Sequence, residues 1–586
     1  MVTAKSTDDR SHRGPRVSRH SLRIVATATA VTAALAFAPL PSDDRASAPV
    51  TQEATYEGAQ YREEYIETLD LSPSHLPADT TTRLHADVLR SSEVAWSERQ
   101  PVVLVVSPYT SHSDTDAVSG GDGPNPRFFD FLDVTGALDR GYTFVQVDLP
   151  GFGGSGGCND WGGPVEQRGV KEAVEWAAAQ PWSTGRVALL GKSYDGWTGL
   201  MGMAQDPVGL AAVVSMEPVF SGYRYLHNDG VRFFNAVGTP AIFQVYDAMP
   251  GALNDDAEYH LSGAPQAWCY GTNLALQQQD SEDVGFWQER NLVELAAGSD
   301  VPLFLTQGFL ETNTKPDAAF AYWNAMDSEH NRAWFGQFDH VRGWETNGEG
   351  RYEMGRSVFA SELNRFLDEH LKGITPDVAD ATVAVQDNLG RYRAEDAWPP
   401  ADAEQRTTAL AVGSVTDGSG TTYSTAGVWS VSEPLDGVRW LAGEPVVSAS
   451  VTTDVPRTNL VANVYDVAPD GTAVHVSRGT TLIRGTGDQV VDIAMYGQDW
   501  VFAPGHRIAV RLVGGNTDWW QHVATRTTVD VRGATITLPL LTEARTQFLD
   551  GGSTPRLEQH LGRSLDLNAV DVTTVAFDLG PDLRAP

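Results

Sequence analysis

The chain has few cysteines and few positive charges. Its 586 residues include 2 cysteines, and 42 Lys and Arg stand against 76 Asp and Glu, so the formal net charge is −34. Two thiols are too few for a metal centre built from cysteine. A surface this acidic repels phosphate backbones, so we expect no nucleic-acid partner.

The chain also lacks a long hydrophobic run near its start. The apolar stretch at residues 24–38 is shorter than the about 20 residues that a membrane-spanning helix needs. Arginines precede it, and small-residue cleavage sites follow at 36–38 and 46–48. We therefore interpret residues 1–48 as a secretory leader and expect a secreted protein without stable membrane insertion. An uncleaved anchor is the alternative.

The two cysteines are Cys158 and Cys269. In a secreted protein such a pair is reasonably interpreted as one disulfide, which would connect two distant segments of the chain. Two buried free thiols are the alternative.

Between residues 55 and 376, apolar β-branched runs alternate with helical patterns. This alternation predicts a mostly parallel sheet flanked by helices. The predicted strands are 102–106, 142–147, 187–191, 210–216, 301–305 and 333–337, and the predicted helices are 164–180, 318–326 and 357–372. We assign residues 55–219 and 299–376 to this domain.

Two further regions differ in pattern. Residues 220–298 are rich in aromatic residues and interrupt the alternation, so we predict a helical cap over the site; a surface subdomain is the alternative. Residues 377–586 show short alternating runs separated by turn residues, which predicts an all-β sandwich. Its predicted strands are 407–412, 445–453, 459–467, 489–495, 507–513, 534–540 and 573–579.

The most informative segment lies at residues 187–204. An apolar strand ends at Gly191, Ser193 follows two residues later, and a helical segment continues from there. This layout is typical of a nucleophile elbow, a sharp strand-to-helix turn that exposes a serine above a parallel sheet. The second glycine, Gly196, comes one residue later than usual, and Asp195 takes the usual position. An ordinary turn is the alternative.

A serine nucleophile needs a base and a carboxylate that orients the base. In α/β-hydrolases the acid and then the histidine follow the serine, each after a strand. His340 follows the strand at 333–337 and is the predicted base. Glu311 is the preferred acid because it lies nearest the end of its strand, and Asp317 and Asp339 are the alternatives.

Acyl transfer also needs donors for the developing oxyanion. The backbone N–H of Tyr194, directly after the serine, is one predicted donor. The hydroxyl of Tyr109, which follows the strand at 102–106, is the other. A tyrosine that only packs in the core is the alternative for Tyr109.

Taken together, these motifs resemble the X-prolyl dipeptidyl-peptidase and cocaine-esterase-like (CocE/NonD) serine hydrolases of peptidase family S15. The matching segments, in chain order, are 108–109, 148–151, 191–196, 308–316, 336–340 and the 381–400 lead-in to the second domain. Two positions depart from the family pattern: Glu311 stands where the peptidase branch has aspartate, and Pro150 replaces an arginine.

The resemblance implies an α/β-hydrolase domain with an inserted helical cap, followed by a jelly roll, without cofactor or metal. It implies a serine hydrolase that acts through an acyl-enzyme on Ser193, with Xaa-Pro dipeptides released from peptides as the preferred activity; the leader adds the expectation that this hydrolase is secreted. Ester hydrolysis is the alternative. A dipeptidyl-peptidase also needs a carboxylate for the substrate's α-ammonium, and Glu217, Asp229 and Asp247 are candidates.

A third, remote hypothesis is an inactive scaffold whose sandwich binds carbohydrate or cell wall. It rests on Trp519 and Trp520, whose rings could stack on sugars if exposed. The sequence leaves the oligomeric state open.

Overall fold

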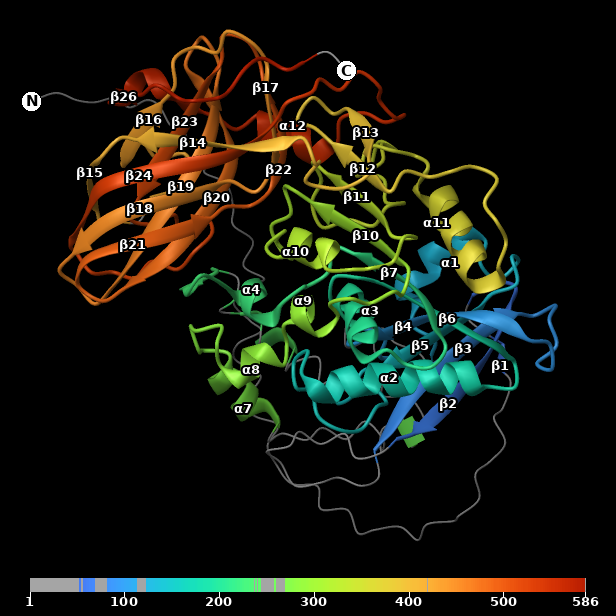
Figure 1. Ribbon diagram of the computed structural model, residues 1–586. Helices are drawn as coiled ribbons and strands as arrows, with labels where there is room; N and C mark the ends of the chain where they lie inside the picture. Colours follow the sequence, from blue (N-terminus) through green and yellow to red (C-terminus); the bar gives the residue numbers. More distant parts are fainter. Residues whose placement is uncertain are drawn as a thin grey trace, which may run out of the picture. The chain divides into compact units, whose positions relative to one another are not determined.

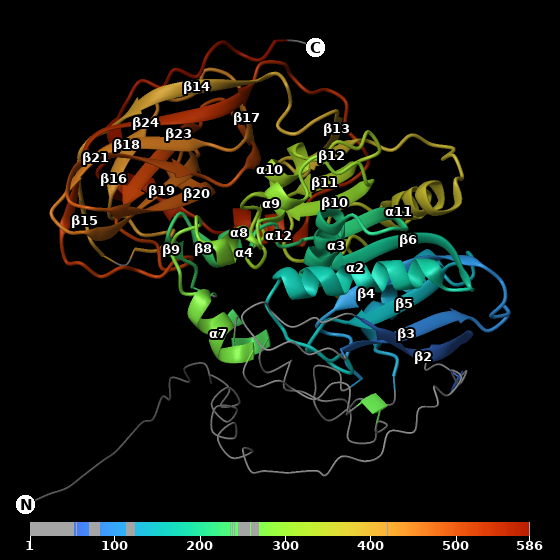
Figure 2. The ribbon, with the colours of Figure 1, turned by 60° about the horizontal axis from the view of Figure 1, so that its bottom comes forward.

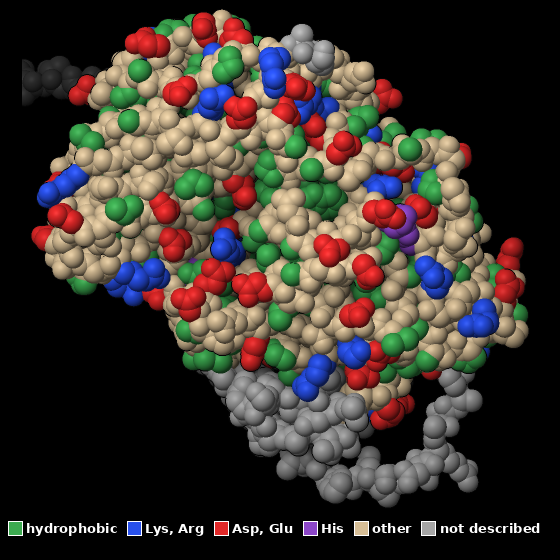
Figure 3. Space-filling view, in the orientation of Figure 1, with side chains coloured by type: hydrophobic (Ala, Val, Ile, Leu, Met, Phe, Trp, Pro, Cys, Tyr) green, Lys and Arg blue, Asp and Glu red, His purple; other side chains and the backbone are tan. Residues whose placement is uncertain are grey.

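The computed structural model describes residues 52–53, 56–68, 82–112, 123–234, 236, 238–239, 241–243, 258–259, 269–418 and 420–584 (Figure 1). The predicted leader, residues 1–48, lies outside this range. Among the described residues no helix has the length and apolar character to cross a membrane. Acidic side chains are spread over the face shown in Figure 3, in keeping with the net charge of −34.

The first domain is built on an eleven-stranded sheet of order β1-β2-β3-β5-β4-β6-β7-β10-β11-β12-β13. The strands from β5 to β12 in this order pair in parallel, and the strands beyond them pair antiparallel. Their bounds are β1 Gln52–Glu53, β2 Ala59–Glu67, β3 Arg83–Ser91, β4 Gln100–Ser107, β5 Thr143–Asp148, β6 Ser183–Lys192, β7 Leu210–Met216, β10 Leu303–Gly308, β11 Arg332–Gly336, β12 Val383–Gln386 and β13 Tyr392–Glu395.

The central strands are apolar throughout because both faces of the sheet are covered. In β4, Val102, Leu104 and Val106 face one core, and Val103 and Val105 face the other. The first core packs against α2 and α3, and the second against α1 and α11 (Figures 1 and 2). These helices span Phe129–Thr135 (α1), Pro164–Ala179 (α2), Tyr194–Gln205 (α3) and Phe359–Leu367 (α11), and α10 spans Ala319–Asn324.

The predicted cap lies between β7 and β10, which are neighbours in the sheet. Its described parts are short helices and a two-stranded ribbon. They are α4 Gly222–Leu226, β8 His227–Asn228, β9 Val231–Arg232, α7 Cys269–Leu276, α8 Gly285–Gln288 and α9 Leu292–Leu295.

The C-terminal region is a sandwich of a seven-stranded and a six-stranded sheet, with one apolar core formed by both. The seven strands are β14 Ala403–Leu410, β15 Gly413–Thr416, β17 Arg439–Gly443, β18 Val446–Thr453, β21 Gly487–Ala494, β22 Gln498–Phe502 and β24 Thr528–Leu541. The six are β16 Val428–Val431, β19 Arg457–Val467, β20 Thr472–Arg484, β23 Arg507–Val513, β25 Leu565–Asp566 and β26 Thr573–Thr574. The short helix α12 spans Pro555–Leu561.

The structure differs in detail from the strands expected for this region. The strands β12 and β13 follow the expected boundary at residue 377 but complete the first sheet, because β12 pairs with β11. The long strand β20 was not predicted, since its buried polar residues interrupt the apolar alternation. The predicted strand at 573–579 is only the two-residue β26.

Buried polar contacts join the first sheet to the sandwich. Arg393 of β13 donates two hydrogen bonds of 2.7 Å to the carboxylate of Asp499 in β22. Gln337, the residue after β11, donates from Nε2 to the Asp499 carbonyl at 3.1 Å. The loop that carries His340 is therefore fixed from the second region as well as from its own strand.

Candidate active site

Ser193 occupies a strained turn between β6 and α3. Its φ and ψ are 66° and −122°, a region that L-residues rarely adopt and that active-site turns often contain. A Cβ on Gly191 would lie 2.2 Å from the backbone of Asp195, so the turn requires glycine there. The Ser193 N–H donates to the Met216 carbonyl of β7 at 2.9 Å, which ties the turn to the sheet.

Asp195, in the position usual for the second glycine, is buried and organises the neighbouring loop. One of its carboxylate oxygens accepts from Ser107 Oγ at 2.5 Å, and the other from Arg127 Nε at 2.7 Å. The same Ser107 Oγ accepts the Tyr109 N–H at 3.0 Å, and the Arg127 guanidinium lies 4.2 Å from the centre of the Tyr109 ring. Asp195 thus links the serine turn to the predicted oxyanion tyrosine.

The predicted base and acid meet. His340 Nδ1 lies 2.7 Å from Glu311 Oε2. Gly308 and Gly336 are paired in register at the ends of β10 and β11, so the loops that follow them are neighbours. Glu311 is fully buried, which raises the pKa of its carboxyl, but His340 and the Asn313 N–H outweigh burial and the pKa lies below its usual value. Glu311 is therefore ionised beside the imidazole.

The two alternative acids have other partners. Asp317 accepts from Arg224 at 3.1 Å and from Asn228 at 2.7 Å, both in the cap. Asp339 lies 3.1 Å from Arg556 Nε of α12. Neither therefore orients His340.

A cavity of about 190 Å³ opens beside Ser193. Most of its lining is aromatic or aliphatic: Tyr109, Trp161, Tyr194, Trp197, Val219, Tyr225, Ile242 and Phe243. Thr314 also lines it, and its hydroxyl is 3.2 Å from His340 Nδ1, which places the base next to the cavity. Within the part of the chain that the structure describes, no hydrogen bond joins the side chains of Ser193 and His340. Such catalytic contacts often tighten only when substrate is bound.

The residues of both predicted oxyanion donors line the same cavity as the serine. Tyr194 is the first residue of α3, where backbone N–H groups have no partner within the helix. Tyr109 lines the same cavity as Ser193. The Tyr194 hydroxyl donates to Glu166 Oε2 at 2.7 Å, which fixes the ring below the turn.

Glu166 is fully buried and lies close to Asp160. Burial, followed by the charge of Asp160, raises the pKa of the Glu166 carboxyl to about 8. Glu166 is therefore protonated near neutral pH and accepts hydrogen bonds from Tyr194 and Gly162 without adding a charge.

Two of the three candidates for binding an α-ammonium, Glu217 and Asp229, have other partners. Glu217 is fully buried and accepts from the Gly308 N–H at 3.0 Å and from Gln307 at 3.2 Å, so it supports the acid loop. Asp229 accepts a hydrogen bond from Thr481 of the sandwich. Asp247 lies outside the described residues.

Among the residues that the structure describes, two side-chain groups have the spacing of metal ligands, His85–Asp87–His112 and His330–Glu369–His370. In the first, His85 Nδ1 is 3.0 Å from Asp148 and His112 Nε2 is 3.1 Å from Asp87. Burial lowers the pKa of His85, but the carboxylates outweigh burial and raise it to about 9. Ion pairs account for this cluster. Asp148 belongs to the motif in which Pro150 replaces arginine, and here it pairs with His85.

Cys158 is disulfide-bonded, and Cys269 is the chain's only other cysteine.

Sequence reasoning missed Arg127, Glu166 and Thr314. Each reaches the site from a distant or irregular segment, and no local motif marks Arg127 or Glu166. Thr314 lies inside the matched 308–316 segment, so its motif position was the one available signal.

A serine on a strained strand-to-helix turn, followed by a buried acid and a histidine on the next two loops, defines an α/β-hydrolase of the serine type. The chain belongs to the X-Pro dipeptidyl-peptidase (S15) family. The family model matches residues 79–342, and the model of the X-Pro dipeptidyl-peptidase C-terminal non-catalytic domain matches residues 377–557.

Individual proteins are similar to the chain in sequence or in fold. The chain is 27% identical over 510 residues to a Streptomyces avermitilis protein named "Putative Xaa-Pro dipeptidyl-peptidase", covering 75% of this chain and 70% of that one. Its fold is similar to a CocE/NonD family hydrolase from Staphylococcus aureus (TM-score 0.62, 16% identity, 82% and 94% of the two chains). It is also similar to an α-amino acid ester hydrolase (TM-score 0.62, 16% identity, 86% and 100%).

The geometry predicts that Glu311→Gln lowers kcat far more than Asp317→Asn does. Glu311→Gln removes the charge that stabilises the His340 imidazolium, so kcat should fall about 10³-fold or more. Asp317→Asn should leave kcat within about tenfold, since Asp317 contacts the cap. Steady-state kinetics on both folded variants checks this, and a larger loss for Asp317→Asn would reverse the assignment.

The raised pKa of Glu166 predicts a pH-dependent stability. In the unfolded chain this carboxyl ionises near 4.5, whereas in the folded protein it keeps its proton to about pH 8. The unfolded state binds fewer protons in this interval, so the free energy of unfolding falls as pH rises. Relative to Glu166→Gln, the wild type should lose stability between about pH 5 and about pH 9 in urea titrations. A difference independent of pH would show that Glu166 titrates normally.

Proposed function

We propose that this protein is an Xaa-Pro dipeptidyl-peptidase that acts through an acyl-enzyme on Ser193. The 2.7 Å contact between His340 and the ionised, buried Glu311, on loops adjacent to the serine turn, carries this proposal. Family membership and the name of the Streptomyces relative support the choice of substrate.

The chemistry follows from the arrangement. Ser193 Oγ attacks the carbonyl carbon of the scissile bond while His340 accepts its proton, and Glu311 stabilises the resulting imidazolium. The Tyr194 N–H and the Tyr109 hydroxyl donate to the oxyanion of the tetrahedral intermediate. His340 then protonates the leaving amine. Water, deprotonated by His340, hydrolyses the Ser193 ester and releases the dipeptide.

The cavity beside Ser193 supports a preference for proline at the residue that is acylated. Its walls are mainly aromatic, and such surfaces bind an apolar ring by removing it from water. An ester with a small apolar acyl group would fit the same cavity, which keeps ester hydrolysis as the alternative activity.

The proposed activity predicts turnover of Ala-Pro-p-nitroanilide that Ser193→Ala abolishes, with a loss of about 10⁶-fold in kcat. Ala-Gly-p-nitroanilide, which lacks the proline ring, and acetyl-Ala-Pro-p-nitroanilide, which lacks the free ammonium, are the matched control substrates. Both should have a kcat/KM at least about tenfold lower.

The same assay includes p-nitrophenyl acetate. Hydrolysis of this ester without any anilide turnover, abolished equally by Ser193→Ala, would move the protein to the esterase alternative. Anilide turnover that survives Ser193→Ala would exclude Ser193 as the nucleophile.

We also propose that the protein is secreted and that residues 1–48 are its leader. The basic residues before the apolar stretch at 24–38 support this. Expression of the full chain in a bacterium with a general secretion pathway should yield extracellular protein whose N-terminus lies between residues 39 and 49. Retention in the cells with Met1 intact would contradict the proposal.

A further inference from the structure

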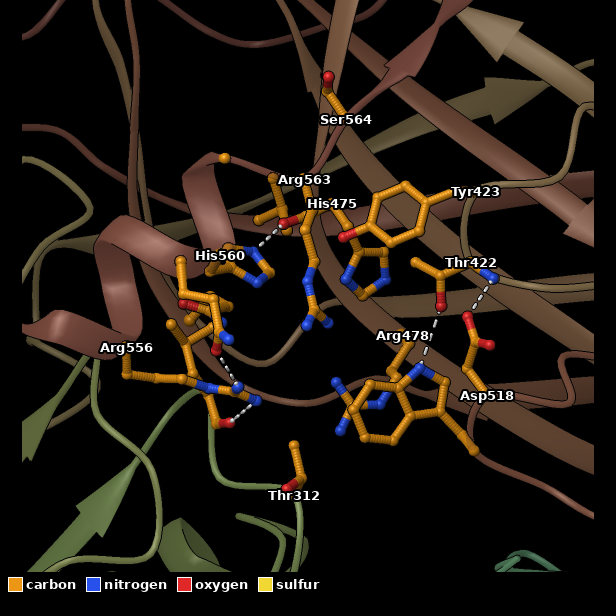
Figure 4. Close-up of a pocket in the computed structure, with 16 residues that line it drawn as sticks. Thr312, Thr422, Tyr423, His475, Arg478, Asp518, Arg556, His560, Arg563 and Ser564 are labelled. Atoms are coloured by element: carbon orange, nitrogen blue, oxygen red, sulfur yellow. Dashed lines mark hydrogen bonds between the residues drawn. The ribbon is translucent and has the colours of Figure 1, made fainter. Parts of the chain in front are cut away.

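A second, larger cavity lies between the acid loop and the sandwich. Its volume is about 880 Å³, and it opens between Leu310 and Thr312 on one side and residues of β20, α12 and the segment after α12 on the other (Figure 4). It shares no lining residue with the cavity beside Ser193.

The cavity is positively charged in a strongly acidic protein. Figure 4 shows the side chains of Arg478, Arg556 and Arg563 extending toward the same space. Its two histidines add no charge near neutral pH: burial lowers the pKa of His560 to about 4 and that of His475 well below its usual value. The Asp518 carboxylate in the wall already accepts the Thr422 N–H at 2.8 Å.

Arg478 is the unusual member of this group. Its residue exposure is 6%, and its Nε and Nη2 atoms are buried without a hydrogen-bond partner. Its guanidinium lies 3.3 Å from the centre of the Trp519 ring, and no carboxylate of the described residues pairs with it. Arg393, which is also buried, instead has the bidentate Asp499 as its partner. A buried guanidinium without an anion is costly, and carboxylates and phosphates are its natural partners.

Arg556 brings the cavity into contact with the catalytic loops. Its Nη2 donates to the Leu310 carbonyl at 3.3 Å, and its Nε lies 3.1 Å from Asp339, the residue before His340. Thr312 faces this cavity, whereas Asn313 and Thr314 face the cavity beside Ser193. Glu311, between them, contacts His340. The cavity is therefore adjacent to the acid loop but separate from the proposed substrate site.

We propose that this cavity is a binding site for a small molecule that carries a carboxylate or phosphate group, with Arg478 as its main anion-binding residue. Arg556 and Arg563 complete the positive wall, and Tyr423 and Trp519 form its aromatic part. This proposal is independent of the substrate assigned to Ser193.

The positions of Trp519 and Trp520 argue against the carbohydrate-binding hypothesis. Arg478 covers one face of its ring, and Trp520 is 1% exposed and packs on Phe233. These two tryptophans do not form the open sugar-binding surface that the scaffold hypothesis requires.

The test measures binding to the full-length protein by calorimetry and by the shift in Tm, with inorganic phosphate and succinate as separate probes. Succinamide, which is similar in shape but uncharged, is the control ligand. At least one anion should bind the wild type and raise Tm with increasing concentration, and succinamide should not. Binding of phosphate alone, or of succinate alone, would show whether the cavity prefers phosphate or carboxylate groups.

Arg478→Met should weaken that binding about tenfold or more without lowering the Tm of the ligand-free protein, since it removes an unpaired buried charge. Arg439→Met, which removes a buried arginine outside the cavity, should leave binding unchanged. If Arg478→Met does not fold, Arg478→Lys serves instead and should weaken binding. The proposal is wrong if neither anion binds the wild type, or if the folded Arg478 variant binds as tightly as the wild type.

Discussion

The contact between His340 and Glu311 is the interaction on which the proposed chemistry depends. It exists because two parallel strands end side by side and their loops turn toward each other. The C-terminal region holds these loops from outside: Gln337 donates to the Asp499 carbonyl, and Arg556 pairs with Asp339. The sandwich is therefore part of the support for the acid and the base, although it supplies neither.

Neighbouring groups determine whether the two buried carboxyl groups near the nucleophile, Glu311 and Glu166, are ionised. Burial raises the pKa of both Glu311 and Glu166. For Glu311, the His340 imidazole and a backbone N–H overcome burial and keep the carboxylate ionised. For Glu166, the neighbouring Asp160 adds to burial and keeps the carboxyl protonated. The site thus has one fixed negative charge where an imidazolium forms, and a neutral support under the oxyanion turn.

Sequence reasoning predicted the parts that depend on local order. These parts are the Gly191–Ser193 turn, the order of strands along the chain and the choice of Glu311 over Asp317. Each depends on short segments whose backbone sets the geometry. Sequence reasoning did not find Arg127 or Arg478, because their roles come from residues far away in the chain. The proposal of Glu217 as the residue that binds the α-ammonium failed for the same reason, because its burial under the acid loop depends on contacts between distant segments. The pairing of β12 with β11 of the first sheet was not predicted, because strand pairing is not a local property of the sequence.

The most direct test is covalent labelling with a fluorophosphonate, followed by peptide mass spectrometry. Wild type, His340→Ala and Ser193→Ala are compared under identical conditions. The account predicts a single adduct on Ser193 in the wild type, much slower labelling of His340→Ala, and none of Ser193→Ala. An adduct on another residue, or equally fast labelling of His340→Ala, would contradict the assignment of Ser193 and His340.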